Sequence, residues 1–129
     1  MSLHDILSSL KNLVDDYETV IDKGKLAVKT EDVESVIVFI NGARSLMERV
    51  QLILPSVREV LNAHGEGDKL VKYINVFYRM LVYVSIPYTL EVMEEAMNLL
   101  DRKGYIKGVV EVKEAINMYE SLIDTLKSK

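Results

Sequence analysis

The stretch LVKYINVFYRMLVYV, residues 70–84, leaves few folds open to this chain. Its strongly polar side chains are Lys72, Asn75 and Arg79. At 100° per residue these three fall within about 60° of one another on a helix, so most of the circumference is apolar and other helices must cover it. The stretch is not a membrane span, because the longest uncharged run, 80–90, is well short of the roughly 20 residues that a bilayer needs. The sequence therefore predicts a central helix at about 69–86.

Apolar residues alternate three and four apart through two long segments that precede this stretch, 3–28 and 33–61. This spacing is typical of amphipathic helices, and the width of the apolar stripes suits a bundle better than a two-stranded coiled coil. Two further helices are expected at about 89–102 and 105–127. The predicted fold class is all-α, a bundle of four to five mostly antiparallel helices around the central apolar helix. Residues 1–129 are expected to form a single helical-bundle domain.

Capping residues predict where these helices begin and end. Ser2 and Asp5 have the spacing of a capping box at the start of the first helix. Thr30, followed by two acidic residues, is expected to be the N-cap of the second helix. Asp68 is expected to cap the central helix, and Gly104 to end the fourth.

The two prolines lead to different expectations. Pro55 falls just outside the apolar stripe, so a kink is expected there and not a chain reversal. Pro87 is expected to end the central helix, because the residue before a proline avoids helical geometry. A strand is the competing interpretation of residues 36–40, and of 105–113, where apolar and polar residues alternate with period two. A helix is favoured for 36–40 because the seven-residue rhythm continues past it, and residues 105–113 are assigned to the last helix although their strand interpretation is the stronger of the two.

The amino-acid composition limits which classes of function are expected. The 16 Lys and Arg against 20 Asp and Glu give a net charge of -4, which argues against nonspecific nucleic-acid binding as the main task. The chain has no cysteine, so it has neither a disulfide framework nor a thiol nucleophile. No signal peptide or serine-nucleophile motif is recognisable, and a cytoplasmic location is expected. Many Val, Ile and Glu with little Gln fit a thermophilic source.

A metal site can be considered in the loop after residue 63. His64, Glu66 and Asp68 stand at alternate positions and could place one nitrogen and two carboxylates around a cation. A zinc site usually needs three or four defined ligands, and no second histidine is nearby. Because cap and turn roles account for all three residues, we predict no metal and no cofactor. A di-iron bundle is excluded, since the chain lacks Glu-x-x-His pairs.

Arg58 and His64 form an Arg-x5-His spacing. This spacing resembles the Arg-x4-6-His motif of the HEPN family of small all-α ribonucleases and toxin partners. The resemblance implies that the two residues line an RNA-cutting cleft, usually at a dimer interface. In the alternative interpretation Arg58 is a solvated helix residue and His64 a helix C-terminal cap that the dipole favours.

Residues 85–107 resemble the recognition helix and following turn of a winged helix-turn-helix domain, with a Leu-Leu-x-x-x-Gly-Tyr-Ile ending. The resemblance implies DNA binding, but Glu91, Glu94 and Glu95 would then face the phosphates. No wing hairpin follows in the sequence. A regulator or subunit associated with nucleic acid remains an alternative, and its candidate residues are Arg102, Lys103, Lys107 and Lys113.

A second apolar row beside the main seam of the central helix is the candidate interface. The main seam, which is expected to face the two long helices, consists of Leu70, Ile74, Phe77, Leu81 and Val84. The second row consists of Tyr73, Val76, Met80 and Tyr83. Tyrosine, methionine and arginine are enriched where an apolar surface meets a partner. The sequence favours a small non-enzymatic interaction or assembly module, acting as a homodimer or as a subunit of a larger complex, whose partner is itself or another protein.

Overall fold

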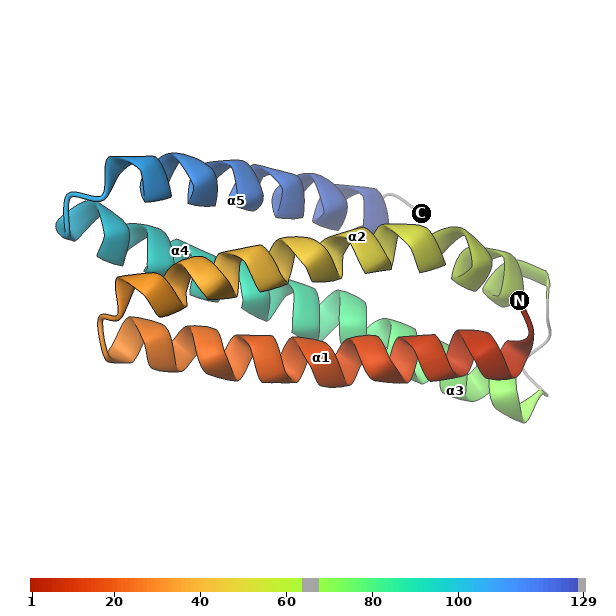
Figure 1. Ribbon diagram of the computed structural model, residues 1–129. Coiled ribbons are helices and arrows are strands. Elements are labelled where there is room, and N and C mark those ends of the chain that lie inside the picture. The colour runs from red at the N-terminus through yellow and green to blue at the C-terminus, as the bar shows by residue number, and fades with distance from the viewer. Residues whose placement is uncertain (64–67, 128–129) are drawn as a thin grey trace.

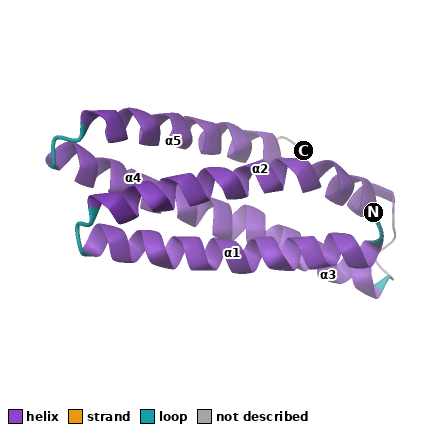
Figure 2. Cartoon of the chain, in the orientation of Figure 1, coloured by secondary structure: helices purple, strands orange, loops and turns teal. Residues whose placement is uncertain are grey.

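The computed structural model describes residues 1–63 and 68–127, which are almost entirely helical. No strand occurs in these two ranges (Figure 2), so both strand interpretations are wrong and the all-α prediction is confirmed. The elements are α1 (Leu3–Lys29), α2 (Val33–Ala63), α3 (Lys69–Met80), the π-helical segment η1 (Leu81–Ser85), α4 (Ile86–Arg102) and α5 (Ile106–Lys127).

The segments α3, η1 and α4 follow one another without a loop and form one continuous helix, called here the α3–α4 rod. The rod lies diagonally behind α1 and α2 (Figure 1). Successive members α1, α2, the rod and α5 run antiparallel, as expected. None of the helices in the described ranges is long and apolar enough to cross a membrane.

Of the three predicted N-caps, two are confirmed and one is wrong. Ser2 and Asp5 form the capping box, since Asp5 N donates to Ser2 Oγ at 3.1 Å and Ser2 N donates to Asp5 Oδ2 at 3.3 Å. The Asp68 carboxylate accepts from the amide of Leu70 at 2.9 Å. Thr30 instead ends α1, because its hydroxyl donates back to the carbonyl of residue 26. Asp32 takes its place, accepting from the amide of Ser35 at 3.3 Å.

Neither proline breaks its helix. Pro55 is exposed and lies inside α2, so its missing N–H faces solvent. The expected end of the helix at Pro87 is wrong. A proline ring clashes with the carbonyl four residues earlier, and the chain accommodates the ring by widening the preceding turn into η1. The amide of Ile86 accordingly donates to the carbonyl of Leu81, five residues back.

The core lies between the four helical rods, but α3 does not occupy its centre. Only Val71 and Ile74 of α3 are buried, whereas α1 packs against α2, α3, η1 and α4. The segment predicted as the central helix, 69–86, is helical throughout, and most residues of its second part are buried, but its first part, α3, is covered on one side only because the stripes of α1 and α2 pack on each other. The largest fully buried side chains come from all four rods and are Tyr17, Tyr119, Leu10, Leu13, Ile40, Met47, Ile74, Leu81, Ile86, Met93, Leu99 and Leu100.

A buried chain of hydrogen bonds links α1, α5 and α2 through this core. The Tyr119 hydroxyl donates to the carbonyl of Ala43, and the Tyr17 and Tyr119 hydroxyl oxygens lie 2.9 Å apart. Because Tyr119 has used its single proton on the carbonyl, Tyr17 must be the donor in the second bond. Burial raises the pKa of both hydroxyls well above the ordinary value near 10, so both stay protonated.

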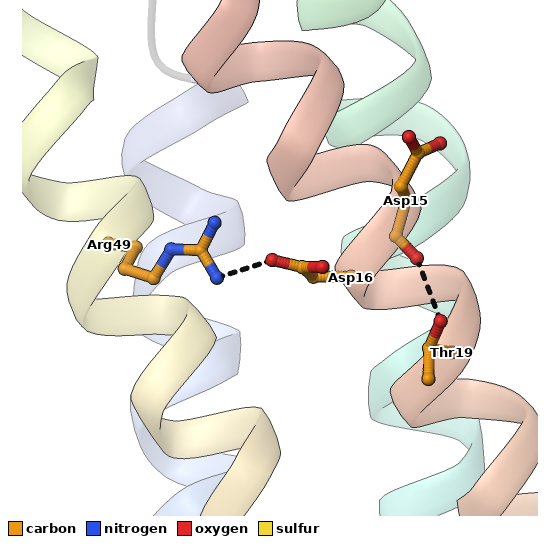
Figure 3. Close-up of polar contacts among 4 residues, drawn as sticks. All are labelled: Asp15, Asp16, Thr19 and Arg49. Atoms are coloured by element: carbon orange, nitrogen blue, oxygen red, sulfur yellow. Dashed lines mark hydrogen bonds and ion pairs between the residues drawn. The ribbon is translucent and has the colours of Figure 1, made fainter.

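Ion pairs at the surface add little to this core. Arg49 Nη1 on α2 lies 2.7 Å from Asp16 Oδ2 on α1, and Thr19 donates to the carbonyl of Asp15 one turn back (Figure 3). Exposed pairs of this kind contribute about 0–1 kcal/mol. The orientation of α1 against α2 therefore depends on apolar packing.

The turn between α4 and α5 depends on two glycines. Gly104 ends α4 as predicted, and its positive φ of 73° places it in the left-handed region that favours glycine. Gly108 is buried at the start of α5, where an added Cβ would meet the ring of Tyr105 and the side chain of Leu100. Its lack of a side chain lets α5 approach α4 closely.

Candidate interaction surface

Six exposed apolar side chains follow one another at helical spacing along the α3–α4 rod, and three of them, Met80, Val84 and Tyr88, also line a groove between the rod and α1. Each of these residues exposes between 36% and 64% of its surface. The line, called here the apolar row, consists of Tyr73, Val76, Met80, Tyr83, Val84 and Tyr88. The four residues predicted from the sequence as an interface are all in it and are all exposed, whereas a monomer could have covered them with α4 and α5.

The packing of the rod explains why the row is left uncovered. α3 packs against α1 and, to a smaller extent, against α2, while α5 packs mainly against α4. From the predicted main seam, Ile74 and Leu81 are buried and Phe77 is partly buried, but Val84 is exposed. Val84 was therefore predicted on the wrong side of the helix.

The π-helical segment accounts for this misplacement. A π turn holds one more residue than an α turn, so it shifts the faces of the residues that follow. In η1 this leaves the adjacent residues Tyr83 and Val84 both outward, and the row is widest there. Tyr88, which was not predicted to belong to the row, continues the line into α4. Pro87 is the sequence signal that could have placed Tyr88 in the row, because a proline within a helix can be preceded by a wide π turn.

Two cations from α1 border the row. Lys11 Nζ lies 6.0 Å from the centroid of the Phe77 ring, and Lys25 Nζ lies 5.2 Å from that of Tyr88. The hydroxyl of Tyr88 raises the pKa of Lys25, which keeps that ammonium group charged. Both ammonium groups therefore lie over the faces of aromatic rings at the edge of the row.

Arg58, one half of the HEPN-like pair, lies in a groove of about 670 Å³ between α2 and α5. Its Nη2 donates to the carbonyl oxygen of Thr125 at 3.1 Å, while its Nε is buried and has no hydrogen-bond partner among the described residues. His64 lies outside the described residues, so the pair itself is not tested. The groove around Arg58 has a mostly apolar lining, which includes Met47, Leu54 and Leu122.

The basic residues of the nucleic-acid alternative gather only in part. Arg102, Lys103 and Lys107 lie at or next to the α4–α5 turn, and Lys113 lies further along α5; all four are exposed. Lys103 Nζ is 3.1 Å from Glu31 Oε1, and this contact lowers the pKa of the glutamate. The acidic partner reduces the positive potential of the group.

The winged-helix expectation for residues 85–107 is wrong. These residues contain the second half of a long rod and a tight turn into α5, and the described chain has no strands from which a wing could be built. The glutamates at 91, 94 and 95 are exposed on the rod.

No group of three or more potential metal ligands occurs within residues 1–63 and 68–127. Of the loop residues considered for a metal, Asp68 serves as the cap of α3, and His64 and Glu66 lie outside the described residues.

No family model, no curated protein and no solved structure matches the chain.

Proposed function

We propose that this chain is a small non-enzymatic helical module that assembles through protein–protein contacts, and that the apolar row is its contact surface. The observation that carries the proposal is the exposure of three tyrosines, a methionine and two valines in one line on one rod. The lack of cysteine fits a reducing compartment, and we propose the cytoplasm as the place where the module acts. A thermophilic source, suggested by composition alone, is part of the same proposal.

The size of the row supports a contact function. With a tyrosine side chain taken at about 200 Å² and the smaller residues at somewhat less, the exposed parts come to roughly 500 Å². This is near the upper end of the largest apolar patch found on a typical monomer, and such patches are often binding sites. Tyrosine and methionine are also among the residue types enriched at interfaces.

The chain offers a matched pair of substitutions for the test. Tyr83→Glu places a charge in the middle of the row, and Leu52→Glu places the same charge on an exposed apolar residue of α2. Both positions are exposed, so both variants should fold like the wild type, which circular dichroism verifies.

The experiment uses tagged wild-type and variant chains, each incubated with untagged wild-type chain and with an extract of the native host. We expect the wild type and Leu52→Glu to retain the same polypeptides, and Tyr83→Glu to lose them. Equal retention by all three chains, or retention of nothing by the wild type, would refute the assignment of this surface.

A further inference from the structure

We propose that the occupant of the apolar row is a second copy of this chain, bound antiparallel across the α3–α4 rod with the two-fold axis between Met80 and Tyr83. The inference rests on the proposed function and adds to it the identity of the partner and the direction in which it lies.

The charges on the rod are separated by sign along its length. Residues 69–80 carry three basic side chains, Lys69, Lys72 and Arg79, and no acidic one. Residues 86–102 carry four acidic side chains, at 91, 94, 95 and 101, and one basic side chain at the end. All of these charged residues are exposed. The apolar row starts within the basic half, where Arg79 lies beside Met80, and ends at Tyr88, before the first of the glutamates.

This separation makes the rod complementary to itself in one direction only. In an antiparallel pair the basic end of each rod faces the acidic end of the other, and both contacts are attractive. In a parallel pair like charges would face each other at both ends, which is unfavourable. A two-fold pair is the commonest form of oligomer, and it uses the same patch on both copies.

The residue numbers place the axis in the π-helical segment. The midpoint between Lys72 and Glu91 is the same as the midpoint between Lys69 and Glu94, and both fall within η1. An axis there sets each lysine opposite a glutamate of the second copy. It also sets Met80 of each copy against Tyr83 of the other, at the widest part of the row.

The area is sufficient for such a pair. Covering about 500 Å² on each copy buries roughly 1,000 Å² in total from the row alone, which is the lower limit for a specific interface. The charged ends, and Lys11 and Lys25 of α1 at the border of the row, add to this area. We therefore expect association at micromolar concentrations and weaker association as salt is added, because the flanking charges are exposed to screening.

Charge reversal in two separate chains tests the arrangement. In a homodimer of the Lys72→Glu chain, a glutamate would face a glutamate at both contacts. In a homodimer of the Glu91→Lys chain, a lysine would face a lysine at both contacts. In an equimolar mixture, one chain of each kind forms a pair in which both contacts are again attractive. Lys113→Glu and Glu114→Lys on α5 provide the matched control, since the same charges change away from the rod.

The dissociation constants are measured by sedimentation equilibrium in low salt, and the composition of the mixed pair by native mass spectrometry. We expect each rod variant to weaken self-association by about tenfold or more, the mixture to restore it as a heterodimer, and the control variants to behave like the wild type.

Three results would overturn the inference, and they separate it from the proposed function. A wild type that stays monomeric at about 100 μM refutes the second copy as partner, while retention of host proteins that Tyr83→Glu loses would still support the interaction surface. A dimer that Tyr83→Glu disrupts but that the mixture does not restore refutes the antiparallel arrangement alone. A dimer that Tyr83→Glu leaves intact refutes both the arrangement and the surface.

Discussion

The buried tyrosine pair allows a quantitative test of the core. Tyr17 donates to Tyr119, which donates to the carbonyl of Ala43, so the two hydroxyls are not equivalent. Replacing either tyrosine by phenylalanine keeps the ring and the packing and removes one hydroxyl. The two substitutions therefore differ only in which hydrogen bonds they remove.

The expected losses follow from the order of the chain of bonds. Tyr17→Phe removes one hydrogen bond and leaves Tyr119 bonded to the carbonyl, so it should lower the free energy of unfolding by about 1 kcal/mol. Tyr119→Phe removes both bonds and leaves the Tyr17 hydroxyl buried without a partner, so it should cost about 2–4 kcal/mol. The double variant has no buried hydroxyl without a partner. The carbonyl of Ala43 also keeps a partner there, because it lies within α2 and accepts the usual helical hydrogen bond.

We therefore expect the double variant to be no less stable than Tyr119→Phe alone, with a coupling energy of about 1–3 kcal/mol between the two sites. The measurement is unfolding by urea, followed by circular dichroism, for the four chains of the double-mutant cycle. If the two single losses are equal, or if they simply add in the double variant, the proposed order of donors is wrong.

Three other outcomes are expected. Burial raises the pKa of both tyrosines, so the folded chain keeps two protons that the unfolded chain loses above about pH 10. The contribution of the two tyrosines to the free energy of unfolding is therefore full below that pH and falls above it by about 2.7 kcal/mol per pH unit. Unfolding curves of the double phenylalanine variant at alkaline pH should lack this slope. An added Cβ at Gly24 would lie 2.5 Å from the buried ring of Phe39, whereas one at Gly42 would lie at an ordinary 3.6 Å from a valine. Thermal unfolding should therefore show that Gly24→Ala destabilises the fold and that Gly42→Ala stabilises it by about 0.5–1 kcal/mol. A change of stability with the same sign in both variants would contradict the close contact at Gly24. Purified chain should not cut RNA, because the Arg-x5-His spacing of Arg58 and His64 is all that supports an active site. RNA cleavage that Arg58→Ala abolishes would establish the nuclease alternative.

The helices themselves could be predicted because their signals are local. The capping box at Ser2 and Asp5, the cap at Asp68 and the left-handed Gly104 each depend on residues within one turn. The apolar rhythm likewise reports which side of a helix can be buried. Thr30 was assigned wrongly because threonine suits an N-cap and also the last turn of a helix, where its hydroxyl can donate back to a carbonyl.

The turn before Pro87 could not be predicted with the same rule that worked for Pro55. Both prolines lack a donor, and both lie within helices. At Pro55 the α-helix continues, while at Pro87 a π turn precedes the ring and shifts the faces of the residues around it. The choice between a break and a wide turn depends on whether the helix beyond the proline can pack, and α4 does so against α1 and α5. That is a tertiary contact, which no local rule contains.

The apolar row shows why more of the surface of α3 was predicted to be buried than the fold buries. In a bundle of four rods each helix touches its neighbours with one side, and the opposite side faces outward whatever its composition. Along α4 most exposed residues after Tyr88 are acidic, as expected for a solvated face. Along α3 and the π-helical segment, Tyr73, Val76, Met80, Tyr83 and Val84 are exposed beside the basic side chains. Core and interface residues follow the same helical period, so the sequence reveals an excess of apolar surface but not which side has a neighbour. The fold of one copy leaves this excess uncovered, and the change of charge sign along the rod, from the lysines of α3 to the glutamates of α4, is the feature that favours a second copy lying across it.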